Sequence, residues 1–276
     1  MNFLFWNACR RDISQEISEL IEYTCANILI LAEYDGEINI ILRKLHKKGL
    51  NYFSVPSIAC ERIKIITDFD PNCIRHLREA DRYTIKEIRL QGESPIILGL
   101  VHLSSKLYSS DDDQLQEASY FRHDLEESEK DAGHKSTIVC GDFNMNPFDK
   151  GMVSAGALNS IPCLKTAKSE VRKVKGKEFS FFYNPMWNLM GDYKEPPGTF
   201  FYRSPSYVSY YWHFLDQVIL RPGISERLNK STLSVLTKAG EVDFVDRYGK
   251  PKTSDHLPLF FSLEPNKEDI YEESMA

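Results

Sequence analysis

The chain has 276 residues, of which 42% are hydrophobic, and a formal net charge of −6. A chain of this length can bury a substantial core, and two-layered β folds of this size often form a single domain. The negative net charge does not point to a nucleic-acid binder, and no window approaches the ~18 apolar residues of a membrane span. We expect one globular domain without membrane contact.

The six cysteines include no Cys-x-x-Cys pair, and several lie in apolar runs. This usage indicates buried thiols in a reducing compartment and argues against a zinc site. The N-terminus runs directly into an apolar stretch, and Arg10 and Arg11 follow that stretch instead of preceding it, which is not a signal-peptide pattern. We therefore expect a cytoplasmic protein.

Helical and extended patterns alternate along most of the chain. Strands are predicted at 51–58, 61–67, 83–90, 95–103 and 136–141, with two or three more from 216 onward; helices are predicted at 12–26, at 37–48 and from Asp111. Asp12 is the expected N-cap of the first helix, and the basic residues at 43–48 are expected on the solvated face of the second. This order predicts an α+β sandwich of two packed sheets with helices on the outer faces, at 1–264, followed by an acidic tail at 265–276.

Two segments in the second half have unusual composition. Residues 165–177 carry six basic side chains against one acid, lack helical periodicity, and predict a flexible basic loop whose Lys173, Lys175 and Lys177 contact phosphate. The segment 179–214 is rich in aromatic residues and is broken by glycine and proline. We expect most of its rings to pack the loop onto the sheet and two or three, including Trp212, to stack on a ligand.

The string Gly141-Asp142-Phe143-Asn144 follows the β-branched run 137–140. Side chains two apart in an extended chain point the same way, so Asp142 and Asn144 leave the strand side by side. Asp-x-Asn before a proline is also common turn chemistry, because both side chains can bond their own backbone. A second string, Ser254-Asp255-His256, places a carboxylate beside an imidazole at the start of another apolar run. Two such clusters at strand ends predict an active site above a sheet.

These strings resemble signatures of the endonuclease/exonuclease/phosphatase superfamily, the DNase I-like enzymes. Further positions match the family's strand ends in the family's order: Asn7 after Phe3–Trp6, Glu33 after Ile28–Ala32, His102 after Gly99–Val101, and Asp216 before Gln217–Leu220. The resemblance spans residues 3 to 260 and implies a four-layer α-β-β-α fold. It also implies a divalent-metal-dependent phosphodiesterase.

The resemblance implies a role for each matched residue. Glu33 is the expected main ligand of Mg²⁺, with Mn²⁺ as an alternative ion, and Asn7 and Asp255 complete or support the metal site. Asp142 holds or deprotonates the attacking water, while Asn144 donates to a non-bridging phosphate oxygen. A hard divalent ion with oxygen ligands suits this chemistry because it offsets the charge of the phosphodiester.

The two matched histidines are expected to bind the phosphate from opposite sides, and either can handle protons near neutral pH. Asp216 is expected to accept a hydrogen bond from His256 and to fix its tautomer. In the DNase I-like branch, a glutamate on a nearby strand plays the same part for the histidine that matches His102. Glu61, at the start of Glu61–Ile66, occupies the matching place.

Three functions stay open at this stage. The first is an intracellular nuclease that hydrolyses DNA or RNA, supported by the motif set and the basic and aromatic segments. The second is a phosphatase or phosphodiesterase acting on a small-molecule or lipid-derived phosphate ester, favoured by the acidic net charge. The third is a catalytically silent binding module. AP endonucleases place an Asn-x-Tyr-x-Pro-Asn string where this chain has Val101–Ser105, which disfavours abasic-site specificity.

Overall fold

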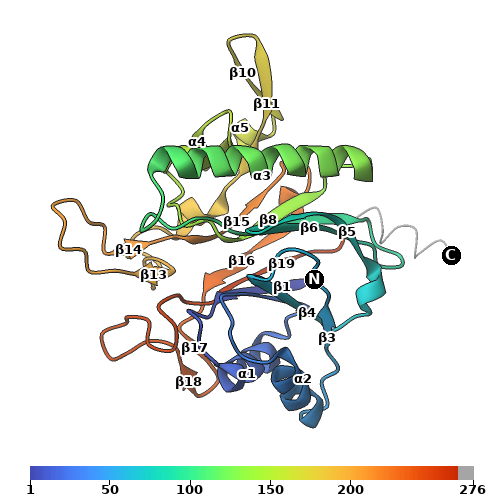
Figure 1. Cartoon of the computed structure of the whole chain (residues 1–276), viewed down its shortest axis with the longest axis vertical. Coiled ribbons are helices and arrows are strands. Elements are labelled where there is room, and N and C mark those ends of the chain that lie inside the picture. The colour runs from blue at the N-terminus through green and yellow to red at the C-terminus, as the bar shows by residue number, and fades with distance from the viewer. Residues whose placement is uncertain (267–276) are drawn as a thin grey trace.

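The computed structural model describes residues 1–266, so residues 267–276 of the predicted acidic tail lie outside the described residues. Two large sheets pack face to face, and helices cover the outer face of each (Figure 1). This is the four-layer α-β-β-α arrangement, and the predicted α+β sandwich is confirmed. Within the described range, no helix is long and apolar enough to cross a membrane.

The first sheet has six strands and contains both ends of the sandwich domain. Its order is β16 (Leu228–Val235), β19 (Leu259–Leu263), β1 (Asn2–Asn7), β2 (Ile28–Ala32), β4 (Ile63–Thr67) and β3 (Phe53–Val55). β1 lies parallel to β2 and antiparallel to β19. The ends of β1 and β2 that carry Asn7 and Glu33 therefore meet at one edge of this sheet.

The second sheet has seven strands. Its order is β5 (Ile74–Ala80), β6 (Tyr83–Ile88), β7 (Ile96–His102), β8 (Thr137–Asp142), β15 (Asp216–Leu220), β12 (Phe182–Tyr183) and β9 (Ser160–Ile161). β5 was not predicted, because its sequence Ile-Arg-His-Leu-Arg-Glu-Ala is polar and lacks the alternation of a half-buried strand. It is an edge strand, where polar and charged side chains are usual.

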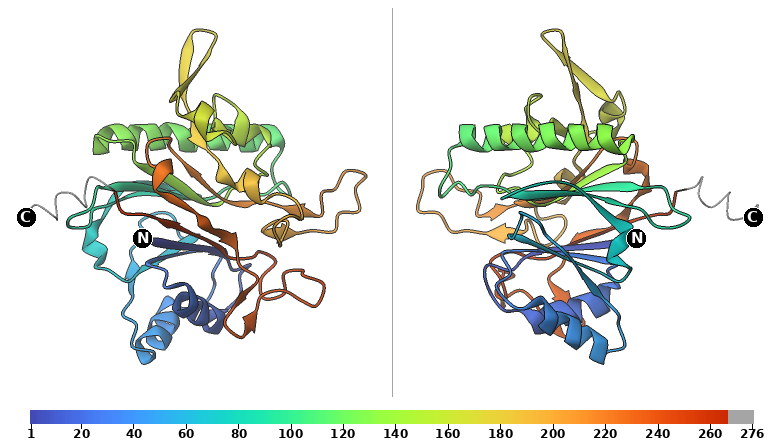
Figure 2. Two further views of the ribbon diagram at one scale, coloured as in Figure 1. Left: turned by 180° about the vertical axis from the view of Figure 1, so that it is seen from behind. Right: turned by 45° about the vertical axis from the view of Figure 1, so that its right-hand side comes forward.

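Helices α1 (Ser14–Thr24) and α2 (Ile38–Lys47) pack outside the first sheet, and α3 (Asp111–Ala132) runs across the second (Figures 1 and 2). Asp12 lies one residue before the N-cap of α1, which is Ile13, although its carboxylate accepts a hydrogen bond from the Ser14 amide. Shorter elements are α4 (Lys150–Val153), α5 (Leu164–Ala167), the 3₁₀ turns Pro71–Cys73, Pro185–Leu189 and Ser225–Arg227, and the ribbon β17 (Lys238–Ala239) with β18 (Val242–Asp243).

Alternation along β8 shows how the layers are filled. Ile138 and Cys140 point into the core between the two sheets, whereas Val139 points to the apolar face of α3 and packs with Phe121 and Leu125. A strand buried on both faces reads as a continuous apolar run, as the sequence of β8 does. The core thus holds the end of β8, and Asp142 with it, in a fixed place.

Residues 165–177 are not a flexible loop. After α5, β10 (Val171–Val174) and β11 (Lys177–Ser180) form an antiparallel hairpin. Its two turn residues, Lys175 and Gly176, both have positive φ, which matches the right-handed twist of the strands. The hairpin projects beyond α3, at the side of the molecule away from α1 and α2 (Figures 1 and 2).

Candidate active site

Three strand ends of the second sheet place His102, Asp142 and Asp216 side by side. β8 pairs in parallel with β7, which puts Asp142 opposite His102, and antiparallel with β15, which puts it opposite Asp216. Gly141 makes this approach possible. It has a φ of +150°, and a Cβ there would lie 2.0 Å from the Val101 carbonyl oxygen, so no other residue fits.

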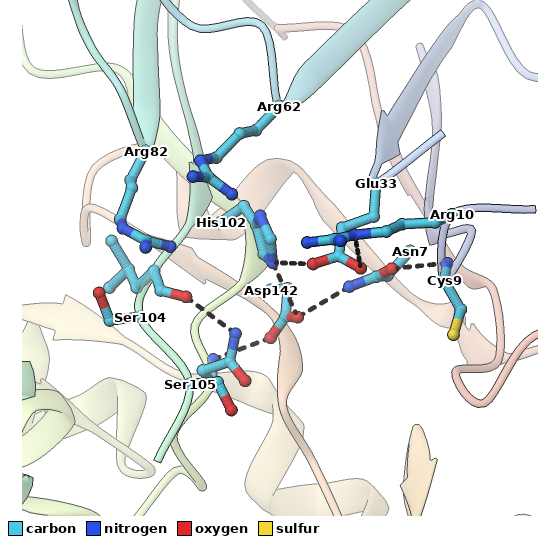
Figure 3. A network of polar contacts seen from close by, with 12 residues as sticks. Asn7, Cys9, Arg10, Glu33, Arg62, Arg82, His102, Ser104, Ser105 and Asp142 are labelled. Carbon is cyan, nitrogen blue, oxygen red and sulfur yellow. Dashed lines mark hydrogen bonds and ion pairs between the residues drawn. The ribbon is translucent and has the colours of Figure 1, made fainter. Parts of the chain in front are cut away.

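The first sheet contributes Asn7 and Glu33 from across the core. The Asn7 side-chain amide donates to Asp142 Oδ2 at 2.9 Å, and Glu33 Oε1 lies 3.2 Å from His102 Nε2 (Figure 3). Hydrogen bonds and ion pairs therefore join the two sheets directly at this edge.

Asp142 lies at the centre of the cluster. Its Oδ2 is 3.8 Å from His102 Nε2 and 4.0 Å from His256 Nε2, in addition to the contact with Asn7. Its Oδ1 accepts a hydrogen bond from the backbone amide of Asn144 at 2.8 Å. The carboxylate is almost completely buried, and so are both histidines. Two imidazoles and one carboxylate thus face a common point with little access to bulk water.

His256 and Asp216 form a buried hydrogen-bonded pair, with 2.7 Å between Nδ1 and Oδ2. Burial alone would lower the pKa of His256, but the charges of Asp216, Asp142 and Asp255 outweigh it and raise that pKa to about 10. Because Nδ1 is held by Asp216, Nε2 is the nitrogen that faces the cluster. The structure brings this predicted pair together.

The backbone is strained around the cluster. Glu33 and Asn144 both have positive φ, at 47° and 51°, and so do Cys9 and Arg10 in the turn after β1. Non-glycine residues rarely adopt this conformation, and such outliers concentrate at functional sites. Glu33 is one of these residues, and its carboxylate lies 3.2 Å from His102 Nε2. A hydrogen bond from His102 lowers the pKa of Glu33, although burial acts in the opposite direction.

Two predicted contacts differ in the structure. Glu61 does not pair with His102: β4 begins at Ile63, so Glu61 lies exposed in the turn before the strand. His102 Nδ1 has no hydrogen-bond partner among the described residues. The Asn144 side chain donates to the Leu103 carbonyl oxygen at 2.8 Å, so its amide supports the loop after β7.

A cleft of about 310 Å³ opens beside Glu33. Its lining residues are Arg10, Glu33, Tyr34, Asp35, Glu61, Arg62 and Asp81. Arg62, Arg82 and Arg10 surround the His102 and Glu33 side of the cluster (Figure 3). Sequence reasoning missed these arginines, because they come from three different turns and only the tertiary fold brings them together.

Two hydroxyl side chains for which the sequence predicted no role hold the site from behind. The Ser254 hydroxyl donates to the Asn7 carbonyl oxygen at 2.7 Å and accepts from the His256 amide, which ties the second signature string to β1. The Thr199 hydroxyl accepts from the Asp216 amide at 3.1 Å. A serine or threonine in a loop carries no signal of such a role until its partners are known.

The donor set fits a divalent cation. Glu33 and Asp142 lie beside His102, and the charge of Asp255 acts on His256. Among the described residues, Asp142, Asp216 and His256 have ligand atoms within 4.8 Å of one another. The hydrogen bond between His256 and Asp216 already engages His256 Nδ1 and Asp216 Oδ2. Glu33, whose side chain is 26% exposed toward the cleft, is therefore the more accessible hard oxygen ligand.

The predicted substrate contacts lie apart from this cluster. Lys173, Lys175 and Lys177 are on the projecting β10–β11 hairpin (Figures 1 and 2). Trp212 is partly buried against the core, with its ring 5.3 Å from that of Phe201. The structure does not bring the lysines to the active-site cluster, and it uses Trp212 at least partly to pack its loop.

Solved structures with the same architecture cover nearly the whole chain. A 3′ phosphatase from Neisseria, NExo, bound to a product DNA hairpin matches with a TM-score of 0.55 and 15% identity over 96% of this chain and 99% of that one. An AP endonuclease from Archaeoglobus fulgidus matches with a TM-score of 0.54 and 14% identity over 95% and 99%. The endonuclease domain of TRAS1, a telomere-specific non-LTR retrotransposon, matches with a TM-score of 0.52 and 13% identity over 95% and 97%.

No protein-family model and no curated protein sequence matches the chain. The likeness therefore lies in the fold, which these structures share over almost their full lengths despite low identity. Together with the order of the strands in the two sheets, it shows that the chain has the DNase I-like fold.

Proposed function

We propose that the protein is a divalent-metal-dependent phosphoesterase, and more specifically a nuclease that cleaves DNA or RNA phosphodiester bonds by water attack. One observation carries the proposal: the buried Asp142 carboxylate lies between two histidines and is held by Asn7. This arrangement can bind a water molecule beside an anionic phosphate, which a purely structural cluster has no need to do.

Each residue of the cluster has a definable role. Asp142 accepts a hydrogen bond from the attacking water and takes its proton, while the Asn7 amide fixes the carboxylate. His256, oriented by Asp216, donates from Nε2 to a phosphate oxygen. His102 donates from the opposite side. Glu33 would be the main ligand of Mg²⁺ or Mn²⁺, supported by Asn7 and Asp255, and the ion would neutralise charge that builds up on the phosphate.

The surroundings of the cluster and the structural neighbours bear on the substrate class. Arg10, Arg62 and Arg82 border the cluster, and arginine suits phosphate recognition because its planar group binds two oxygens at once. The neighbours named above include a 3′ phosphatase bound to DNA, an AP endonuclease and a retrotransposon endonuclease. These points favour a nucleic-acid substrate.

A small-molecule phosphate ester is the second candidate. The cleft beside Glu33 also carries Asp35, Glu61 and Asp81, and the chain is acidic overall. Acidic walls repel a polyanion and tolerate a single phosphate held by a metal ion. For the compartment we propose the cytoplasm, supported by the six cysteines, all of which are free thiols.

The decisive test incubates the purified protein with Mg²⁺ or Mn²⁺ and a panel of substrates: single- and double-stranded DNA and RNA, and soluble phosphate esters. Asp142→Asn is the inactive comparison, and Glu241→Gln, an exposed carboxylate in the β17–β18 turn, is the matched control. We expect metal-dependent cleavage of a polynucleotide that Asp142→Asn abolishes and Glu241→Gln retains. Activity on a soluble ester alone would favour the second candidate, and no hydrolysis of any substrate would refute both.

A further inference from the structure

A hairpin beside the active site exposes an unusual number of aromatic rings. β13 (Phe200–Phe201) and β14 (Trp212–His213) pair antiparallel, and a loop of residues 202–211 joins them. Four tyrosines of this loop are exposed, from 48% for Tyr202 and Tyr211 through 60% for Tyr210 to full exposure for Tyr207. The loop extends from the body of the molecule (Figures 1 and 2).

The base of this hairpin is hydrogen-bonded to the two segments that contain His256 and Asp216. Phe200 forms a β-bridge with His256, and the Leu257 amide donates to the Thr199 carbonyl oxygen at 2.7 Å. The Thr199 hydroxyl accepts from the Asp216 amide. The base of the hairpin is therefore held beside His256 and Asp216.

A row of rings leads from the active site toward the tip. The Phe200 ring lies 4.7 Å from the His256 ring, and the Tyr202 ring follows at 6.4 Å from Phe200, nearly parallel to it at 16°. Near the end of the loop, Tyr210 lies 6.1 Å from His213 and 5.4 Å from Phe148. Packing against neighbouring side chains explains the rings next to the active site. It does not explain why the tyrosine rings of the loop are exposed to solvent.

The charge of the hairpin suits an anionic partner. Residues 199–213 contain Arg203 and no acidic residue. In addition, the Lys250 ammonium lies 4.7 Å from the centre of the Phe201 ring. Exposed aromatic rings combined with positive charge and no acids are what binding to unpaired nucleic acid requires, because the bases stack on the rings and the cations contact the backbone.

We propose that the tyrosine loop, defined by Tyr202, Tyr207, Tyr210 and Tyr211, is a stacking platform for unpaired nucleobases adjacent to the scissile phosphate. The protein then acts on single-stranded nucleic acid or on single-stranded ends and gaps. This inference rests on the proposed nuclease function and adds the substrate form and the residues that select it. A duplex keeps its bases stacked on each other and offers none to the platform.

The test measures binding separately from cleavage. In an Asp142→Asn background, which prevents turnover, fluorescence anisotropy gives the Kd for a labelled single strand of roughly twelve nucleotides, within the range of known single-strand sites. Three further changes are compared: Tyr202→Ala with Tyr207→Ala, the same pair changed to Phe, and Tyr23→Ala. Tyr23 is 56% exposed on α1, which packs outside the first sheet and apart from the hairpin (Figure 1), and is the matched control.

We expect the double alanine variant to bind the single strand at least about fivefold more weakly, which corresponds to about 1 kcal/mol and to the low end for one stacked base. The double phenylalanine variant and Tyr23→Ala should bind like the parent. A chain of equal length without bases should bind weakly and without dependence on the tyrosines. In the enzyme with intact Asp142, the double alanine change should raise KM for the single strand and leave kcat nearly unchanged.

Equal binding by the alanine variant and the parent would overturn the inference while leaving the nuclease proposal intact. So would an equal loss of affinity for the strand without bases, since that result would show that the tyrosine loop contacts the backbone of the strand and not its bases. If the parent binds no single strand and hydrolyses a soluble phosphate ester but neither single- nor double-stranded DNA or RNA, both the platform and the nuclease assignment fail, and the phosphoesterase chemistry stands. Thermal unfolding of each variant checks that the fold is retained.

Discussion

Glu79 on β5 should stabilise the fold strongly at neutral pH and lose that effect in acid. One of its carboxylate oxygens accepts from the backbone amides of Ile58 and Ala59 at 2.8 and 2.7 Å, and the other accepts from Thr84 and from the Lys86 ammonium at 2.9 Å. The side chain is only 2% exposed. Burial alone would raise the pKa of Glu79, but these hydrogen bonds outweigh it and lower the pKa from 4.5 to about 2.

The magnitude follows from this pKa. At about 1.4 kcal/mol per pH unit, the fall from 4.5 to about 2 corresponds to about 3 kcal/mol of folding free energy. Because the folded pKa lies below the unfolded one, this stabilisation is fully present above pH 4.5 and is lost as the pH falls toward 2. Glu79→Gln should therefore lower the free energy of unfolding by about 3 kcal/mol at pH 7, and more than half of that difference should be gone at pH 3.

Urea denaturation of both proteins at several pH values measures the difference, and carboxylates common to both cancel. Glu241→Gln, at an exposed turn, is the control and should change stability little at any pH. Hydrogen exchange supplies a local readout, because the amides of Ile58 and Ala59 should exchange faster once their acceptor is weakened. A loss below about 1 kcal/mol at pH 7, or a loss that is the same at pH 3, would refute the reasoning.

Three further predictions concern catalysis. Glu33→Gln should weaken Mg²⁺ binding, measured by calorimetry, and lower activity at least about 100-fold; unchanged metal affinity would place the metal elsewhere. Asp142→Asn should abolish turnover while the melting temperature stays close to that of the parent; a large loss of thermal stability would instead make its role structural. Neutralising Lys173, Lys175 and Lys177 together should raise KM for long polynucleotides and flatten its salt dependence, with a minimal phosphodiester nearly unaffected. Equal effects on both substrates would exclude a contact with long chains.

Much of the site could be predicted because its members directly follow apolar strands. Asn7, Glu33, His102 and Asp142 each stand at the end of an apolar run, and the ends of such strands meet at the edge of a sheet. The structure brings these four together. Their catalytic roles stay predictions, since proximity alone does not test them.

The errors have physical reasons. Glu61 was placed on a strand, but β4 starts two residues later, and the first residues of a strand are hard to locate from sequence. The hairpin of β10 and β11 was missed because its strands are mostly exposed and polar, so they lack the alternation of a half-buried strand. The sequence signal of this hairpin is its Lys175-Gly176 turn. The arginine contacts depend on three separate turns and leave no pattern in the sequence.

The edge where the two sheets meet has a consequence for how mutations far from the cleft can act. Asn7 with Asp142, and His256 with Asp216, are bonds between groups carried by opposite sheets, and the apolar core between the sheets sets the spacing of both pairs. A smaller side chain anywhere in that core that lets the sheets slide or approach changes both spacings together. The geometry of the site therefore depends on how the two sheets pack. We expect such a core mutation to lower activity under conditions in which the protein is still folded.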